Sequence, residues 1–364
     1  MDLSLDEEWS LFQQDKTIES ITDKNKNNVE KDIPKCSDIY ISTQTKIGYL
    51  NKEIDLNLLF WKIPIIPYYM QKEGIIKKSM KINCKTKQEV EELDKKIENI
   101  NNINVNVISK INENKTRKIA FKEVRKIDIG ISKKDIISNR RKIKGAFYNC
   151  FAVILRTKNH DDTFKEIHVK IFNTGKLEIP GIQNDLILEK TLNKLTEILN
   201  KITGKKTDEK ITWLSDKLQT VLINSNFNAG YYIKRFDLYI ILKEKYKINS
   251  NYDPCSYPGI QCKFYYHPDN TEHDGVMDNK NTQLNKDLWK AISFMIFRTG
   301  SILIVGNCDI NVLKIIYKYL KQLLHVEYDN ICIKHTFEKK EKAKRQKKKT
   351  RTITFINNAS QTSS

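Results

Sequence analysis

The sequence has no apolar run that reaches the roughly 18 residues a membrane-spanning helix needs. Its first residues, MDLSLDEEWSLF, are acidic, whereas a secretory signal peptide is basic and then apolar. The chain has seven cysteines, an odd number, and no C-x-x-C pair, so it encodes no recognisable disulfide framework or zinc site. We expect a soluble intracellular protein that binds no membrane and whose thiols are reduced and mostly buried.

Catalytic signatures are missing as well. The six histidines lie in predicted loops or stand alone on predicted strands, and no nucleophile, base and orienting partner group within a motif. No glycine-rich phosphate-binding loop occurs. These absences argue against an enzyme, and we expect no catalytic residues, no cofactor, no metal site and no small-molecule substrate.

What the sequence has in excess is positive charge. Its 364 residues include 64 Lys and Arg against 45 Asp and Glu, a formal net charge of +19. This excess favours a polyanionic partner, with nucleic acid ahead of an acidic membrane surface. The segment KKEKAKRQKKKTR (339–351) has nine Lys or Arg and one Glu. Such a run is typical of a disordered tail that contacts phosphate or acts as a nuclear localisation signal, and a merely solvating tail is the alternative.

One stretch of the sequence is repeated. VKIFNTGKLEIPGIQN (169–184) and FMIFRTGSILIVGNCD (294–309) share an Ile-Phe pair, a turn glycine and a strand-end glycine. These features recur at one constant offset of 125 residues: Phe172 with Phe297, Gly175 with Gly300, and Gly181 with Gly306. A constant offset across three separate structural roles indicates an internal duplication.

The sequence pattern predicts two similar halves, each with a strand, a helix, three strands and a closing helix. In the first half the closing helix covers 184–202, with Asn184 as its N-cap and its leucines near helical spacing. The predicted divisions are an acidic, disordered segment 1–36, a first repeat 37–204, a second repeat 213–333 and the basic tail 334–364. The stretch 64–144, rich in lysine and asparagine and with one mixed-charge helix, is predicted to be an insertion in the first repeat.

The second predicted hairpin is apolar on both faces. Because side chains alternate along a strand, one face is expected to meet the helices and to hold Ile292, Phe294, Ile296, Ile302 and Ile304. The opposite face carries Met295, Phe297, Leu303 and Val305. A sheet covered by helices on one side is normally polar on its open side. This second apolar row is therefore either covered by another element or is a binding surface.

Two sets of motifs resemble the TATA-box-binding protein (TBP) family, in the divergent form found in large DNA viruses. The first is a hairpin of the type I-F-x-[ST]-G-[KS], with a glycine closing its second strand, which occurs at 171–176 and again at 296–301. The second is the stirrup loop YDPCSYPG at 252–259. CFAVILR (150–156) is similar to the matching first-repeat strand, and ISTQTKIG (41–48) to the opening strand.

This resemblance covers roughly residues 37–330 without the insertion. It implies an α+β saddle, in which two pseudo-symmetric repeats form one curved antiparallel sheet with helices on the convex face. It also implies that the concave face binds the minor groove of double-stranded, A·T-rich promoter DNA and that the protein recruits initiation factors and RNA polymerase. We therefore expect a general transcription initiation factor in the nucleus or a viral factory, or packaged in the virion.

Four positions of the sequence correspond to the aromatic residues that the family inserts between bases: Cys150, Phe172, Tyr257 and Phe297. The last three keep a ring, and the resemblance assigns them to DNA binding. Cys150 cannot wedge between bases, and its neighbour Phe151 is expected to face the core unless the strand slips by one residue. The resemblance assigns further groove contacts to Met295, Leu303 and Val305.

The resemblance also points to polar contacts. The second of the family's two central asparagines falls on Asn224, with Asn226 as the alternative, while the first repeat offers only Ser42, Thr43 and Gln44 nearby. The partner-binding residues of the stirrup are Asp253, Cys255 and Ser256. Asp253 keeps the family's acidic contact, but Cys255 and Ser256 replace the acidic-Leu pair that family members offer to transcription factor IIB. A factor similar to IIB is the expected partner, with a changed interface.

The first repeat differs from the family on its groove-facing side, where Lys170 and Glu178 replace apolar residues, with Pro180 beyond them. Lys170 and Glu178 are expected on the same side of adjacent strands, close enough for a cross-strand or diagonal ion pair. Burying such a pair under DNA is costly because both charges lose water. We expect the second repeat to contribute most of the groove binding.

Two other functions fit the same sequence. One is a TBP-fold module that binds proteins within a transcription assembly and has lost autonomous DNA binding. The other is a substrate-binding domain of a nuclease or glycosylase, which is disfavoured because no catalytic segment accompanies it. Binding to a random pool of duplexes separates the first alternative from a DNA-binding factor.

The basic tail generates a prediction about salt. Lysines that contact phosphates release counterions, so deletion of residues 339–364 is expected to flatten the dependence of DNA affinity on salt concentration. Affinity titrations of the full and shortened chains at several salt concentrations measure the two slopes. Identical slopes would mean that the tail does not touch DNA.

Overall fold

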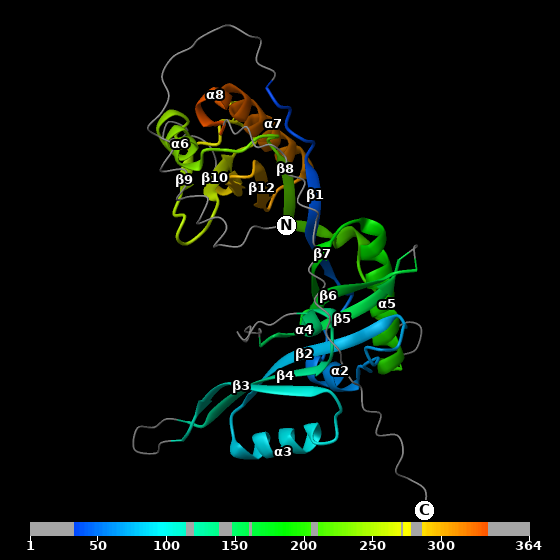
Figure 1. The fold of residues 1–364 in the computed structure, drawn as a ribbon. Coiled ribbons are helices and arrows are strands. Elements are labelled where there is room, and N and C mark those ends of the chain that lie inside the picture. Colours follow the sequence, from blue (N-terminus) through cyan, green and yellow to red (C-terminus); the bar gives the residue numbers. More distant parts are fainter. Residues whose placement is uncertain are drawn as a thin grey trace, which may run out of the picture. The chain divides into compact units, whose positions relative to one another are not determined.

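The computed structural model describes residues 33–113, 120–137, 148–159, 162–204, 210–270, 272–277 and 286–333. Most of the acidic segment and the whole basic tail that the sequence predicts lie outside these residues. The described chain divides into two compact units (Figure 1). The second-repeat unit holds residues 33–46 and 219–333, and the first-repeat unit holds residues 47–218. Among the described helices, none is long and apolar enough to cross a membrane.

The second-repeat unit contains the second predicted half. Its strands are β8 (Gln219–Asn228), β9 (Asn249–Asn251), β10 (Ile260–Tyr266), β11 (Lys290–Ile296) and β12 (Ser301–Gly306), together with the first part of β1 (Tyr40–Tyr49). Its helices are α6 (Arg235–Ile240), the π-helical turn η3 (Ile241–Lys245), the 3-10 turn η5 (Lys286–Leu288), α7 (Ile310–Val326) and α8 (Tyr328–Ile331). The strand order is β1-β8-β12-β11-β10-β9, and the pairs from β8 to β9 are antiparallel.

The first-repeat unit is larger. Its strands are β2 (Gly74–Cys84), β3 (Ile103–Ile111), β4 (Lys122–Gly130), β5 (Cys150–Lys158), β6 (Phe164–Phe172) and β7 (Lys176–Ile182). Its helices are α2 (Leu56–Lys62), α3 (Lys87–Ile97), α4 (Lys133–Ile137), α5 (Asp185–Thr203) and the short η2 (Ser215–Lys217). The strand order is β3-β4-β2-β5-β6-β7-β1, so β1 belongs to the strand order of both units and the twelve strands form one open sheet.

The predicted fold class, an α+β protein with two repeats in one open antiparallel sheet, is confirmed by this strand order. The sequence predicts four strands in each half, and this count is wrong in both. Among the described residues, the second half has five strands, because β9 follows its first helix, and the first half has seven, because β2, β3 and β4 all lie in the predicted insertion 64–144. β9 has only three residues, all Asn or Ser, and carries no apolar pattern. β2 has three lysines in eleven residues, so its sequence pattern places it in the insertion.

Lys78 explains how the lysine-rich β2 fits into the core. Its side chain lies on the helix-covered face of the sheet, and its ammonium donates to the backbone carbonyl of Ile63 at 2.7 Å and of Trp61 at 3.3 Å. These carbonyls lie at the C-terminal end of α2, where cations are favoured. Burial lowers the pKa of Lys78 to about 8. The carbonyls at the end of α2, which have no partner within the helix, thus accept the hydrogen bonds that the buried ammonium needs.

The duplication predicted from the constant offset is visible in the hairpin turns. Gly175 and Gly300 have φ angles of 78° and 76°, a region that favours glycine. Each turn is held by the segment that follows the first strand of its repeat. The amide of Leu50 donates to the carbonyl of Gly175 at 2.8 Å, and the amide of Ala229 donates to the carbonyl of Gly300 at 2.8 Å. The two hairpins are therefore equivalent in conformation and in attachment.

The core of each unit lies between one face of the sheet and the helices. In the second-repeat unit, the five side chains predicted to meet the helices are fully buried: Ile292, Phe294, Ile296, Ile302 and Ile304. They pack with buried residues of α7 such as Leu313, Ile316 and Leu320. In the first-repeat unit, α2 and α5 cover the equivalent face of β5, β6 and β7.

Helix α5 begins where the sequence predicts. The side chain of Asn184 accepts a hydrogen bond from the amide of Ile187 at 2.9 Å, so the predicted N-cap is confirmed. Four of its leucines are buried in the core: Leu188, Leu192, Leu195 and Leu199. Leu186, which the spacing groups with them, is 68% exposed because it lies in the first turn on the solvent side. The predicted mixed-charge helix corresponds to α3.

The cysteines are mostly buried, as predicted. All seven lie among the described residues and all are free thiols. Five are buried, Cys36 is partly exposed and Cys255 is exposed.

The turn at Gly300 generates a stability prediction. A Cβ atom on Gly300 would lie 2.2 Å from the carbonyl oxygen of Tyr231, and the φ angle of 76° disfavours any other residue. Strain of this kind costs on the order of 1–3 kcal/mol, and the backbone collision adds to it. Gly300→Ala is therefore expected to lower the unfolding free energy measured in urea by more than the control Gly181→Ala. Gly181 has a φ of 83°, and a Cβ atom added there would meet nothing within 4 Å, so the control reports φ strain alone.

Equal losses from the two glycine substitutions would show that the collision with the Tyr231 carbonyl adds nothing to the φ strain.

Candidate nucleic-acid interface

The apolar row predicted on the second hairpin lies on the open face of the second-repeat unit. Met295 is directly opposite Leu303 in the β11–β12 register, and Val305 is directly opposite Asn224 in the β12–β8 register. Their neighbours along each strand point into the helix-covered core. The three apolar side chains are partly exposed, so the structure describes an open sheet face that is apolar where a solvated face is usually polar.

Two of the predicted inserting residues form a pair. The rings of Tyr257 and Phe297 have centroids 5.9 Å apart at an interplanar angle of 60°. Gly259 lies beneath both rings, since a Cβ atom there would be 3.0 Å from Phe297 and 3.1 Å from Tyr257. The glycine of the YPG motif therefore leaves the space in which the two rings lie over the backbone.

The stirrup is held by a residue that sequence reasoning missed. Arg235, at the start of α6, donates a hydrogen bond to the carbonyl of Pro258. Its guanidinium also lies 5.5 Å from the ring centre of Tyr252, in a cation–π arrangement. Arg235 is only 7% exposed. No sequence signal identifies this residue, because its partners lie on a loop that is distant along the chain.

The three predicted partner-binding residues lie together on one exposed turn. The carboxylate of Asp253 accepts hydrogen bonds from the hydroxyl of Ser256 and from the amide of Cys255, the latter at 3.1 Å. These bonds hold the pKa of Asp253 below its ordinary value. The carbonyl of Asp253 also accepts from the amides of Ser256 and Tyr257, at 3.2 and 3.0 Å. Asp253 thus orders the turn that carries Tyr257.

Both candidate asparagines lie on the open face of β8, because Asn224 is opposite Val305 and Asn226 is opposite Leu303. The side-chain amide of Asn224 donates to the hydroxyl of Thr43 at 3.1 Å. The hydroxyl of Ser42 donates to the backbone carbonyl of Asn224 at 3.0 Å. The structure therefore brings Asn224 together with two of the polar residues predicted at the start of the first repeat.

The open face of the first-repeat unit is different. Phe172 is opposite Cys150, so the third predicted inserting ring faces a thiol instead of a second ring. Burial raises the pKa of the Cys150 thiol, which is 5% exposed. The ammonium of Lys176 lies 5.9 Å from the ring centre of Phe172. Phe151 is fully buried in the core, which confirms that the strand does not slip by one residue.

The predicted ion pair of the first repeat is confirmed. Lys170 and Glu178 are directly opposite each other on β6 and β7, with the ammonium 2.7 Å from the carboxylate. Their side chains are 25% and 29% exposed, so the pair remains in contact with water. This face therefore presents charge at the position where the second-repeat unit presents apolar side chains.

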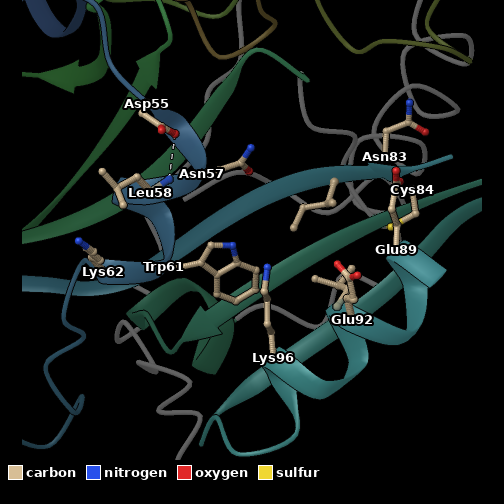
Figure 2. A pocket seen from close by; sticks show the side chains of 12 residues that line it. Asp55, Asn57, Leu58, Trp61, Lys62, Asn83, Cys84, Glu89, Glu92 and Lys96 are labelled. Carbon is tan, nitrogen blue, oxygen red and sulfur yellow. Dashed lines mark hydrogen bonds between the residues drawn. The ribbon is translucent and has the colours of Figure 1, made fainter. Parts of the chain in front are cut away.

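A groove of about 530 Å³ lies on the helix-bearing side of the first-repeat unit. Figure 2 shows α2 and α3 facing each other across it, with Trp61 of α2 turned toward α3. Its apolar lining includes Leu58, Trp61, Ile82 and Leu93, and its charged lining includes Asp55, Lys62, Glu89, Glu92 and Lys96. Sequence reasoning did not find it because α3 belongs to the insertion. Among the described residues, no group of three His, Cys, Asp or Glu side chains is arranged to hold a metal ion.

Comparison with known proteins places these features in context. No protein-family model matches the chain. A TATA-box-binding protein-like protein of Acanthamoeba polyphaga mimivirus is 28% identical over 195 residues, which cover 51% of this chain and 50% of that protein. The resemblance to the TATA-box-binding protein family is confirmed. The chain thus spans about half the length of this curated relative.

A comparison of structures matches the TBP of Methanococcus jannaschii, with 12% identity, 80% of this chain and 99% of that chain covered, and a TM-score of 0.34. A score of this size does not bear on the fold, which rests on the strand order and the paired hairpins described above.

Proposed function

We propose that the protein is a TBP-type transcription initiation factor without enzymatic activity. In this proposal it binds the minor groove of A·T-rich promoter DNA with the open face of the second-repeat unit. The observation that carries the proposal is the apolar row Met295, Leu303 and Val305 beside the ring pair of Tyr257 and Phe297. The similarity to a protein named TATA-box-binding protein-like supports the same conclusion.

The chemistry of the minor groove fits this surface. A·T pairs present only acceptors there, whereas G·C pairs add the amino group of guanine, which an apolar surface cannot satisfy. An apolar face therefore favours A·T-rich DNA by shape and by the absence of that donor. The side-chain amide of Asn224, at the edge of the apolar row, can donate a hydrogen bond to the base acceptors in the groove. The rings of Tyr257 and Phe297 are suited to wedge into a base step and kink the duplex.

The two units are proposed to contribute unequally. In the first-repeat unit, DNA would cover the ion pair of Lys170 and Glu178 and remove water from both charges. That desolvation is costly unless the charges find new partners. Phe172 also lacks a second ring, because Cys150 is its neighbour. Most of the favourable burial in the groove therefore comes from the second-repeat unit.

The stirrup is proposed to recruit a factor similar to transcription factor IIB, and through it RNA polymerase. Asp253, Cys255 and Ser256 are all exposed on one turn whose conformation the Asp253 carboxylate fixes. Cys255 and Ser256 offer a thiol and a hydroxyl, so the partner surface is expected to be less basic and less apolar than one built for an acidic-Leu pair. The proposed location is the nucleus or a viral factory, with the virion as the alternative.

A protein-binding module without autonomous DNA binding is the second candidate function. The groove between α2 and α3 favours it, because the groove combines apolar side chains, among them the exposed Leu58, with both signs of charge. The two functions separate experimentally: a DNA-binding factor selects sequences from a random duplex pool, and a pure protein module does not.

The first prediction from this proposal concerns DNA bending. The protein is expected to bind A·T-rich duplex in preference to G·C-rich duplex and to shorten its end-to-end distance, because the wedging rings kink the helix axis. Fluorescence energy transfer across an end-labelled duplex measures both properties. Equal affinity for the two sequences with no change in transfer efficiency would exclude groove binding and favour the protein module.

The second prediction concerns the asymmetry of the two units. Phe297→Ala is expected to lower affinity for A·T-rich DNA more than Phe172→Ala, because Phe297 has the ring partner Tyr257. The double replacement Lys170→Leu with Glu178→Val is expected to raise affinity, since no charge is then desolvated. Its unfolding free energy should change by no more than about 1 kcal/mol, because partly exposed ion pairs contribute little to stability.

Equal losses from the two Phe substitutions, or weaker binding by the double replacement, would show instead that the first-repeat unit engages DNA through its charges.

A further inference from the structure

The connection between β4 and β5 has to cross a strand. In the first-repeat unit the strand order is β4-β2-β5, so the chain that leaves β4 at Gly130 passes over β2 before it enters β5 at Cys150. β2 is antiparallel to both neighbours, which makes β4 and β5 parallel. Gly130 pairs with Lys77 and Phe151 with Met80, so the connection has to cross β2 between these two levels. Such a connection covers either the helix-bearing face or the open face.

The contacts of α4 place it on the open face. Lys78 of β2 points to the helix-covered side, so the adjacent Lys77 points to the open side. The ammonium of Lys77 lies 2.7 Å from the carboxylate of Asp135 in α4. The start of α4 is held as well, because Ser132 donates to Asp135 from its amide at 2.9 Å and from its hydroxyl at 2.6 Å.

A second contact ties the beginning of α4 to β6. The amide of Lys133 donates to the two carboxylate oxygens of Glu166 at 3.2 and 3.0 Å. Glu166 is opposite Arg156 and next to the core residue Ile167, so it too lies on the open face. Burial would raise the pKa of Asp135, but the hydrogen bonds from Lys77 and Ser132 hold it below its ordinary value, which keeps the carboxylate charged.

The far end of the same connection also touches the open face. Tyr148 precedes β5, and the ammonium of Lys81 lies 3.7 Å from its ring centre. Lys81 lies four residues after Lys77 on β2 with no register shift between them, so both side chains point to the open face. On the same face of β4, Asp128, which is opposite Ser79 of β2, is only 7% exposed.

The second-repeat unit has no such element in the corresponding connection, all of which the structure describes. There β9 leads to β10 through residues 252–259, which form the stirrup. The apolar row of that unit is partly exposed. The described ends of the β4–β5 connection therefore add to one repeat a covering segment that the other repeat lacks.

We propose that α4 is an autoinhibitory segment, held by the Asp135–Lys77 and Lys133–Glu166 contacts, which occludes the outer open face of the first-repeat unit against DNA. This inference rests on the proposed minor-groove function. DNA and α4 then compete for one face, and release of α4 lengthens the stretch of duplex that the protein covers. While α4 is docked on this face, DNA cannot bind there. The larger the fraction of protein with α4 docked, the lower the apparent affinity for DNA.

Two substitutions in the full chain test the proposal with opposite changes of charge. Asp135→Asn removes a negative charge and Lys77→Gln removes a positive one, yet both break the contact that holds α4. Simple electrostatics predicts that the first strengthens and the second weakens binding to DNA. Occlusion predicts that both raise affinity for A·T-rich duplex, by about threefold or more if the docked state dominates.

The matched control is Asp162→Asn, which breaks an exposed pair with Lys158 on the turn between β5 and β6 and also removes one negative charge. Hydrogen exchange of the free proteins reports whether the amides of α4 lose protection, while unchanged protection of β5 and β6 amides shows that the unit remains folded. Affinity titrations and a hydroxyl-radical footprint on an A·T-rich duplex report the DNA side. The expected result is faster exchange in α4, higher affinity and a longer footprint for both variants but not for the control.

Unchanged exchange in α4, an affinity that follows charge alone, or a loss of affinity in both variants would overturn the proposal. The last outcome would mean that docked α4 contacts the phosphates itself. Failure of the unmodified protein and of all variants to bind duplex DNA would instead overturn the proposed function, and the occlusion with it.

Discussion

The core-forming helices of each repeat, α2 and α5 in one and α7 in the other, pack on one face of its sheet, and the other features depend on that constraint. Alternation along β11 and β12 buries Phe294 and its row against α7, which leaves Met295 and Leu303 on the uncovered side. An apolar row in that position is only partly buried within its own unit. Such a row is typical of a surface that a partner covers, and the proposed partner is the minor groove of A·T-rich DNA, which lacks the guanine amino group.

Equivalent hairpins are fixed to their repeats in the same way, but the connections beside them differ. The turns at Gly175 and Gly300 share their φ angles and their hydrogen bonds to the preceding segment. In one repeat the third strand is reached through a short stirrup ordered by Asp253 and Arg235. In the other it is reached through α3, β3, β4 and α4. Divergence after duplication is therefore concentrated in a single connection, whereas the paired framework is kept.

Charge explains why the divergent repeat is the weaker candidate for groove binding. The pairs Lys170–Glu178 and Lys77–Asp135 both lie on its open face, and all four side chains keep contact with water. Such pairs cost little when solvated and much when a partner removes that water. The same contacts that make the face unfavourable for DNA also hold α4 over it. The open face of the second-repeat unit carries its apolar row without ion pairs of this kind among the described residues.

The sequence by itself determined the features that depend on neighbours a few residues apart. Alternation and turn chemistry specified the two hairpins, the buried side of Phe151 and the Lys170–Glu178 pair, while the N-cap of α5 followed from Asn184. Only the tertiary structure decided what depends on distant segments. The lysine-rich β2 fits the core because Lys78 reaches the carbonyls of α2, and α4 lies on the open face because of its contacts with Lys77 and Glu166, which no local pattern encodes. Strands that are distant in sequence pair according to the burial and hydrogen bonding of the whole unit. Their pairing therefore leaves no pattern among neighbouring residues of the sequence.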